Sequence, residues 1–364
     1  MSMVLNQYAA SPVPLRNSFL PRQALLFQQP LFQDDWGSAF GALRAMNSTL
    51  LSPGYLALKE HAAWMDLSER GKLRMTGDHR KRLLHAMSTN QVQKLEPGEG
   101  CYAFFLNAQG RILADANIFV LEDSVLLDTE PETRQKLREH LDRYIIADDV
   151  TVEDVTPAMA TIALEGPEAE DFLKQHAAPV PQKAFTTERW GARLIARASV
   201  TGTPGFLIFL PQHEKEDLLA QFSLSGLGEA TAAEARTVRI ENGHPRYGEE
   251  ITERYLVQET GQLQAVNFEK GCYLGQEIVE RVRSRAQIHR ILRRVEIDTR
   301  EVPEPGAKFQ SKLESGTEDG GEIVSAVFSP ALEKVVALAY IRSRFADPGT
   351  ALVLGDQPAI VGKF

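Results

Sequence analysis

The sequence predicts an α+β protein whose chain ends in a small β-barrel. Its 364 residues are enough for two or three domains. From about residue 34 to residue 284, strand-like segments alternate with amphipathic helical segments. From residue 285 onward the helical periodicity ends, and short strands follow one another with Gly and Pro turns between them. We therefore expect a loosely ordered extension at 1–33, two α+β modules at 34–284 and the barrel at 285–364.

The extension at 1–33 contains Arg16 and Arg22, several Ser and Pro residues, and no Asp or Glu. This composition is similar to that of an organellar transit peptide, which makes the mitochondrial matrix the alternative location. The stretch lacks a sustained amphipathic helical pattern, so a loosely ordered terminus explains it better. The two cysteines are too few for a disulfide framework or a four-thiolate metal site, and they suit a reducing compartment. We expect a cytoplasmic protein.

Charge and hydropathy exclude further classes of protein. The net charge of −9 means that the molecule as a whole repels phosphate, which disfavours a dedicated nucleic-acid binder. The longest apolar runs, Phe206–Leu210 and Val335–Ile341, fall far short of the roughly 20 residues that span a bilayer. Nucleotide-binding glycine loops, paired zinc histidines and Cys-x-x-Cys motifs are absent from the sequence. We expect no membrane contact and no metal held by this chain alone.

The first α+β module is expected to contain a β-hairpin between helices. Apolar residues at helical spacing predict its helices, and Asn107–Gly110 predicts the turn of the hairpin. Asp78 is placed to cap a helix. The expected elements are a helix at Trp36–Leu50, a strand at Lys72–Met75, a helix from Asp78 to Met87, strands at Tyr102–Leu106 and Ile112–Leu121, and a helix at Thr133–Ile146.

The second α+β module begins with the same order of strand, glycine and helix, and the barrel follows it. Its expected strands are Met159–Leu164, Ala192–Ser199 and Gly205–Leu210. One expected helix carries Phe172 and Leu173, and two more span Glu214–Phe222 and Thr231–Glu241. The expected barrel strands are Ile291–Ile297, Glu322–Phe328, Lys334–Tyr340 and Thr350–Leu354.

The run Lys270–Glu277, with the sequence Lys-Gly-Cys-Tyr-Leu-Gly-Gln-Glu, is the strongest local signal for chemistry. Gly271 and Gly275 allow the backbone to bend tightly around Cys272 and to approach a ligand. Lys270 and the nearby arginines favour the thiolate, which is the reactive form of cysteine. A buried cysteine that packs as a small hydrophobe is the alternative. The glycines and polar neighbours favour a functional thiol.

A basic segment follows this run. From Lys270 to Arg294 there are seven Lys or Arg residues against two Glu residues. Such a segment would suit a carboxylate-rich ligand tail, a phosphate or RNA. The alternation of Arg281, Arg283 and Arg285 fits a solvated strand face equally well. The residues alone do not decide between a binding patch and a solvated face.

Asp115 lies in an apolar strand, where it shares a face with Leu113 and Asn117. A carboxylate there must be hydrogen-bonded or face a cleft, because burial without a partner is costly. In a cleft it would bind an amine or an amide-like ring edge. An Asp on the solvent side of an edge strand is the alternative.

Together these residues resemble the YgfZ-type folate-binding proteins, which are relatives of the aminomethyltransferase (T-protein) of glycine cleavage. The octet at 270–277 matches the motif of that family, and weaker motifs follow the family's order from about Gln33 to the C-terminus. These are Asp66–Ser68 with Gly71 and Lys72, Ser88–Asn90, Gly110–Asp115, Leu164–Pro167 and Arg239–Gly248. The resemblance implies a three-module ring of the aminomethyltransferase type, with tetrahydrofolate in its central hole and the barrel as the third module.

The resemblance also implies the site residues. Asp115 matches the carboxylate that faces the folate in the transferase, and Tyr102 lies in the matching strand. Cys272 and Asp115 are the expected catalytic groups, and Lys270 and Arg281 are expected to bind the anionic tail. The other expected folate-binding residues lie in the cysteine motif: Gly271, Tyr273, Gly275, Gln276 and Glu277.

One segment departs from the transferase pattern. Thr203, Pro204 and Leu207 occupy positions where the transferase carries carboxylates. A pterin presents paired donors that suit a carboxylate, so the loss of one would cost a few kcal/mol of recognition. Folate binding would then be weaker, differently oriented or absent. This departure argues against the transferase itself.

Three functional hypotheses follow. The first is a folate-binding accessory protein that supports iron–sulfur enzyme assembly or repair and tRNA thiolation, with Cys272 as its working thiol. Its partners would be iron–sulfur proteins or their assembly machinery. The alternative is a tetrahydrofolate-dependent aminomethyl or one-carbon transferase, in which Asp115 positions the reacting amine. A third is an RNA-binding adaptor that contacts tRNA through the basic stretch at 281–294.

Overall fold

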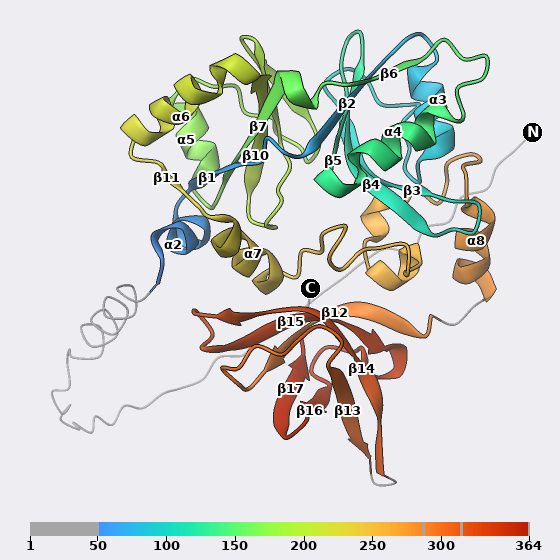
Figure 1. The fold of residues 1–364 in the computed structure, drawn as a ribbon, viewed down its shortest axis with the longest axis vertical. Coiled ribbons are helices and arrows are strands. Elements are labelled where there is room, and N and C mark those ends of the chain that lie inside the picture. Colours follow the sequence, from blue (N-terminus) through green and yellow to red (C-terminus); the bar gives the residue numbers. More distant parts are fainter. Residues whose placement is uncertain (1–50, 286–287, 314–315, 363–364) are drawn as a thin grey trace, which may run out of the picture. The chain divides into compact units, whose positions relative to one another are not determined.

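The computed structural model describes residues 51–285, 288–313 and 316–362. All of them belong to one compact unit, Ser48–Phe364. The extension at 1–33 and the helix expected at Trp36–Leu50 lie outside the described residues. The strands form a five-stranded sheet, a six-stranded sheet and a closed six-stranded barrel (Figure 1). The predicted fold class, α+β with a C-terminal β-barrel, is therefore confirmed.

The first sheet has the strand order β3-β4-β5-β2-β6, and all its neighbours are antiparallel. The expected hairpin joins β3 to β4, and the N–H of Gly110 donates to the carbonyl of Asn107 within its turn. Helices α3 and α4 cover one face through Leu84 and Leu141. The elements are β2 (Gly71–Thr76), α3 (Arg80–Met87), β3 (Gly100–Leu106), β4 (Ile112–Val120), β5 (Val125–Thr129), α4 (Arg134–Asp142) and β6 (Thr151–Asp154).

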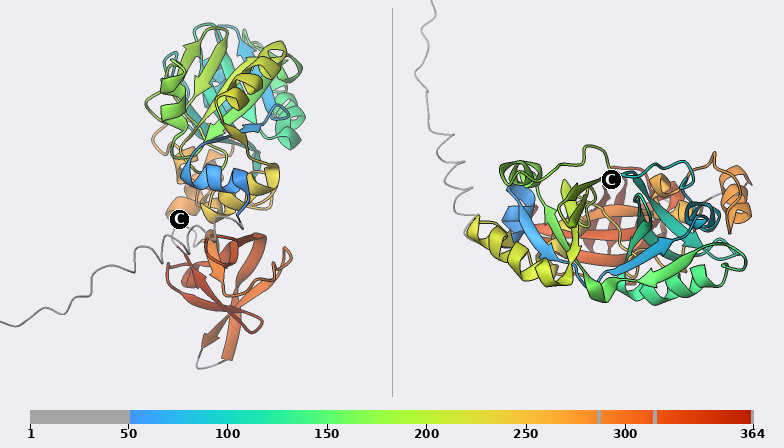
Figure 2. Two further views of the ribbon diagram at one scale, coloured as in Figure 1. Left: turned by 90° about the vertical axis from the view of Figure 1, so that its left-hand side faces the viewer. Right: turned by 90° about the horizontal axis from the view of Figure 1, so that it is seen from above.

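The second sheet has the order β11-β1-β7-β10-β9-β8. Its strand β1 precedes the whole first sheet in the sequence, so the chain passes between the two sheets more than once. Helices α5 and α6 cover one face (Figure 2). The opposite face packs toward the first sheet, with the rings of Phe119 and Phe209 5.7 Å apart. The elements are β1 (Ala63–Asp66), β7 (Met159–Glu165), α5 (Ala169–Gln175), β8 (Thr187–Trp190), β9 (Arg193–Ala196), β10 (Gly205–Pro211), α6 (Lys215–Leu224) and β11 (Gly228–Glu229).

Two further helices, α2 (Pro53–Glu60) and α7 (Ala232–Glu241), pack on each other beside this sheet. A capping box starts α7: the Thr231 hydroxyl accepts from the N–H of Glu234, whose carboxylate accepts from the N–H of Thr231 at 2.7 Å. Because this cap fixes where α7 begins, it also fixes which of its side chains face α2 and the barrel.

The barrel closes in the order β12-β15-β14-β13-β16-β17 around a core that includes Val295, Phe309 and Ile341. Two of its strands, β13 and β17, are additional to the four expected from the sequence. The barrel strands are β12 (Arg290–Ile297), β13 (Lys308–Leu313), β14 (Gly316–Ser329), β15 (Lys334–Arg342), β16 (Ala351–Leu354) and β17 (Gln357–Val361).

One alternative left open for the basic segment, the solvated strand face, is excluded, and one local expectation is wrong. Arg281, Arg283 and Arg285 lie on a helix, α8 (Gln276–Arg285), and not on a strand face. Val279 is buried on α8, and this apolar contact outweighs the alternation of charges. Asp78 does not cap α3, because His79 occupies the N-cap position and no side-chain cap hydrogen bond is formed there. None of the described helices has the length and apolar character needed to cross a membrane.

Candidate functional site

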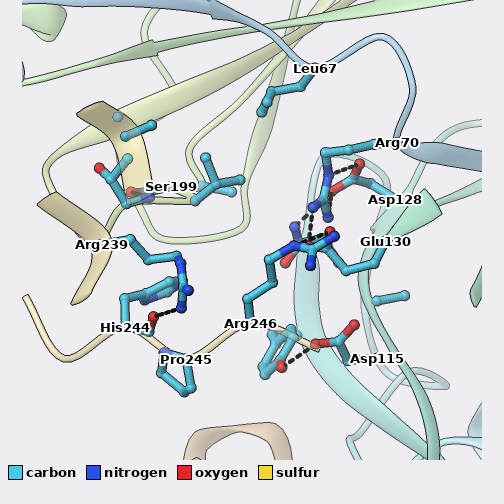
Figure 3. Close-up of a pocket in the computed structure, with 18 of the residues that line it drawn as sticks. Leu67, Arg70, Asp115, Asp128, Glu130, Ser199, Arg239, His244, Pro245 and Arg246 are labelled. Carbon is cyan, nitrogen blue, oxygen red and sulfur yellow. Dashed lines mark hydrogen bonds and ion pairs between the residues drawn. The ribbon is translucent and has the colours of Figure 1, made fainter. Parts of the chain in front are cut away.

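A cavity of about 740 Å³ is lined by residues from both sheets, by the loop at 199–205, and by α7 and the segment that follows it (Figure 3). Its size is typical of small-molecule sites. Apolar side chains such as Leu67, Phe185 and Val200 share the wall with many charged groups. The labelled lining residues in Figure 3 are Leu67, Arg70, Asp115, Asp128, Glu130, Ser199, Arg239, His244, Pro245 and Arg246.

A buried ion network forms one wall of the cavity. The pairing of β2 with β5 places Asp128 beside the residues that follow Arg70. Arg70 donates from Nε and Nη2 to the two carboxylate oxygens of Asp128, both at 2.9 Å, and from Nη1 to Glu130. Glu130 also accepts from Nε of Arg246 at 2.9 Å. The charges of these residues are therefore largely balanced within the wall.

Asp115 lies near this network on β4 and is 7% exposed. One of its carboxylate oxygens accepts a hydrogen bond from the Tyr102 hydroxyl at 2.7 Å. Burial, reinforced by the nearby charge of Glu130, raises the pKa of Asp115 to about 7. No Lys, Arg or His of the described chain forms an ion pair with it. The group can therefore hold or release a proton near neutral pH.

A second buried ion pair stands on the opposite wall. Nη1 of Arg239 on α7 donates to Glu250 at 2.8 Å and to the carbonyl of His244 at 2.8 Å. Glu250 is fully buried and also accepts from the Ser325 hydroxyl on the barrel strand β14. The conformation of this wall therefore depends on the barrel as well as on α7.

The loop at 199–205 is fixed by the buried carboxylate of Glu165. This carboxylate accepts from the Ser199 hydroxyl at 2.9 Å, from the N–H of Val200 at 2.6 Å and from the N–H of Thr201 at 3.1 Å. Thr203 also turns its hydroxyl toward Glu165, at 3.2 Å. The loop thus presents backbone and small side chains, but no carboxylate of its own, to the cavity.

The site residues expected from the sequence separate into two groups. Tyr102 and Asp115 line the cavity together, on neighbouring strands. The lining residues do not include Cys272 or its neighbours in the motif. Cys272 is exposed, while the other cysteine, Cys101, is buried. The thiol and the cavity are therefore distinct features of the molecule.

Lys270 was expected to favour the thiolate of Cys272 and to bind an anionic tail, but its side chain is used inside the protein. Its ammonium group donates to the carbonyls of His85, Ser88 and Asn90 at 2.5, 2.6 and 2.7 Å. Burial lowers its pKa to about 7. Because three carbonyls hold the group inside the protein, it is committed neither to an anionic tail nor to the thiol of Cys272. Lys270 instead fixes the start of the cysteine loop to the end of α3.

Gly275 has a strict conformational role. Its φ is +84°, and a Cβ there would lie 2.7 Å from the carbonyl oxygen of Asn107. Gly271, in contrast, has open space around it. Tyr273 is buried, and burial raises its pKa to about 12.

Helix α8 follows, with Gln276 partly exposed and Glu277 exposed in its first turn. Glu277 pairs with Arg281 at 3.2 Å, both side chains being largely in solvent. Arg281 is not among the residues that line the cavity.

The basic segment does not form one continuous patch of free charge. Arg290 is paired with Glu259 and Arg294 with Glu296, at 2.9 and 2.8 Å. Within the described residues, no cluster of three or more His, Cys, Asp or Glu side chains could hold a metal ion. The sequence reasoning missed the charged wall, although the motif at Arg239–Gly248 was the signal that could have located part of it.

Comparisons with known proteins relate the chain to one family. Residues 34–270 match the family model described as GCVT N-terminal domain. The aminomethyltransferase of Rubrobacter xylanophilus is 28% identical over 309 residues, which cover 83% of this chain and 82% of that protein. The aminomethyltransferase of Streptomyces avermitilis is 29% identical over 315 residues, covering 82% of each. The crystal structure of glycine cleavage system aminomethyltransferase T from Bartonella henselae has a TM-score of 0.76 at 22% identity, covering 85% of this chain and 88% of that one.

Proposed function

Because the chain belongs to the GCVT N-terminal domain family, we propose that its cavity binds a reduced folate and that it is a tetrahydrofolate-dependent one-carbon transferase. The observation that carries this proposal is the pair formed by the buried Asp115 and the half-buried Tyr102 on the cavity wall. The aminomethyltransferase relatives support the same reaction class, and this support outweighs the argument against a transferase that rested on Thr203, Pro204 and Leu207.

The residues of the cavity fit a reduced folate. Its volume of about 740 Å³ lies within the range of sites that enclose drug-sized ligands. Leu67, Phe185 and Val200 provide apolar contact for ring faces. Asp115 provides an acceptor with one oxygen not engaged by Tyr102. When bound, tetrahydrofolate would supply the nitrogen atoms that take up the one-carbon unit.

Asp115 would act on the amine that carries or accepts the one-carbon unit. Its free oxygen accepts a hydrogen bond from that amine, which orients the nitrogen lone pair. With a pKa of about 7, the carboxyl group can take a proton from the amine and return it within one cycle. Tyr102 holds the other oxygen and so fixes the plane of the carboxyl group.

An assay for methylenetetrahydrofolate formed from an aminomethyl donor tests this function. Asp115→Asn is expected to lower turnover about a hundredfold or more, because the variant cannot exchange a proton. Asp123→Asn, an exposed change in the turn between β4 and β5, is the matched control and should leave turnover unchanged. Cys272→Ser should also leave it unchanged. Equal turnover by the wild type and Asp115→Asn would contradict the proposal.

A second candidate function rests on Cys272. The thiol is exposed, lies outside the cavity and sits on a loop fixed by Lys270 and Gly275. These features favour the accessory function of the YgfZ type, in iron–sulfur enzyme assembly or repair and tRNA thiolation. A single thiol supplies one ligand to a cluster, so a partner or a small thiol would complete it.

Complementation of a deletion strain separates the two functions. If the accessory function holds, Cys272→Ser should fail to restore iron–sulfur enzyme activities, while the wild type restores them. Full restoration by Cys272→Ser would exclude a working thiol at this position.

For a tRNA contact through the stretch at 281–294, salt-sensitive tRNA binding should weaken when Arg281 and Arg283 are neutralised.

A further inference from the structure

The arginines that line the cavity are already engaged with protein carboxylates. Arg70 pairs with Asp128, and Arg246 pairs with Glu130. Arg239 pairs with Glu250 at 2.8 Å. A ligand would have to break a buried ion pair to bind any of these cations, which is costly. Recognition must therefore rely on polar groups that keep open hydrogen-bonding capacity.

Two of the side chains with open capacity lie on different parts of the wall. One is Asp115, which offers a carboxylate oxygen. The other is His244, whose ring lines the cavity and makes no hydrogen bond with the residues that the structure describes (Figure 3). Burial, together with the nearby charge of Arg239, lowers the pKa of His244 to about 4. At neutral pH its imidazole is uncharged and carries one N–H donor and one nitrogen acceptor.

The backbone around His244 is held firmly. Its N–H donates to the carbonyl of Arg239 at 3.0 Å, and its carbonyl accepts from the Arg239 guanidinium at 2.8 Å. The loop at 199–205 packs against it: a Cβ added to Gly202 would lie 3.1 Å from the Cβ of His244. Asn242 ties the same segment to that loop by donating to the carbonyl of Thr201 at 3.0 Å. The ring therefore projects from a fixed base.

We propose that His244 is a specificity-determining residue that hydrogen-bonds the edge of the reduced pterin ring. The inference rests on the proposed folate binding. It follows from the position of the ring beside the loop at 199–205, where Thr203 and Pro204 provide no carboxylate. A carboxylate can only accept hydrogen bonds, whereas a neutral imidazole donates one and accepts one. The cavity thus recognises a ring edge that offers both an acceptor and a donor.

Calorimetry under reducing, anaerobic conditions tests this inference with three probes: tetrahydrofolate, 6-methyltetrahydropterin and p-aminobenzoylglutamate. His244→Ala should raise the Kd of the first two about fivefold to tenfold, which is the range expected for one lost hydrogen bond. His244→Gln keeps a donor and an acceptor and should restore most of the affinity. His213→Ala, an exposed change on the segment before α6, is the control and should have no effect.

Three other results would overturn the inference about His244. An unchanged Kd for both ring-containing probes in His244→Ala would overturn the inference and leave the folate proposal intact. A raised Kd for p-aminobenzoylglutamate alone in His244→Ala would also overturn the inference, because His244 would then contact the tail of the folate and not its ring. If the wild type bound none of the probes, the proposed function and this inference would both fail. Thermal unfolding of His244→Ala and His244→Gln shows whether each variant is folded.

Discussion

Replacing Asp115 with Asn should make the protein more stable at pH 8, although it removes a catalytic group. In the folded chain, burial raises the pKa of Asp115 from 3.8 to about 7. In the unfolded chain the same carboxyl group is ionised above about pH 4. Folding at pH 8 therefore requires an ionised group in an unfavourable environment. Asn has nearly the same shape, carries no charge and can still accept from Tyr102.

The magnitude follows from the two pKa values. Below about pH 4 both states hold the proton, and Asp115 has no cost relative to a neutral group. Between about pH 4 and pH 7 the unfolded state releases the proton first, so stability falls as pH rises, by about 1.4 kcal/mol per pH unit. Above pH 7 both states are ionised, and the cost levels off at about 4 kcal/mol. This is an upper value, since solvent that enters the cavity reduces it.

Urea unfolding of the wild type and Asp115→Asn at several pH values between 5 and 8 measures this effect. The variant should gain stability relative to the wild type as the pH rises, by about 2–3 kcal/mol over this range. Asp123→Asn, at an exposed position, should show a nearly constant difference. A variant that is equally stable or less stable at pH 8 would refute the reasoning, because Asp115 would then have a favourable partner for its charge.

Three further predictions concern structural features outside this group. Gly275→Ala should lose at least about 1 kcal/mol in chemical denaturation, because its φ is +84° and its Cβ would meet a carbonyl, while Gly271→Ala should be neutral. Cys272 should react rapidly with a thiol reagent in the native protein, and Cys101, whose pKa burial raises to about 12, only on unfolding; rapid loss of two thiols would contradict this. Glu250→Gln should lower the unfolding free energy by about 1.5–3 kcal/mol, since it weakens a buried charged hydrogen bond while Glu249 still pairs with Arg239; a change below 1 kcal/mol would show that the Glu250 charge is not needed.

Local signals predicted much of the fold. The hairpin of β3 and β4 was predictable because its turn residues and its alternation are adjacent in the sequence. The capping box at Thr231 and Glu234 likewise lies within one helical turn. The same reasoning failed at α8, where alternating arginines imitate a strand. There the burial of Val279 against the rest of the protein determines that the segment is helical. The alternation of charges gives no information about that burial.

Only the part of the site that lies on a single strand was predictable from the sequence. Asp115 stood out because a carboxylate in an apolar strand needs an explanation. The cluster of Arg70, Asp128 and Glu130 could not be predicted, because its members are 58 and 60 residues apart and meet only through the pairing of β2 with β5. His244 was likewise unremarkable in the sequence, since its position on the cavity wall depends on the packing of the loop at 199–205.

The central claim is that the cavity beside Asp115 binds a reduced folate. Calorimetry with tetrahydrofolate and its polyglutamates tests it most directly, on the wild type and on Asp115→Ala. We expect the wild type to bind with a stoichiometry of about one ligand per chain, as one cavity of this size implies. Asp115→Ala should bind at least about fivefold more weakly, because a buried hydrogen-bond acceptor is lost. The absence of binding heat and of competition by any of these folates with the wild type would contradict the claim.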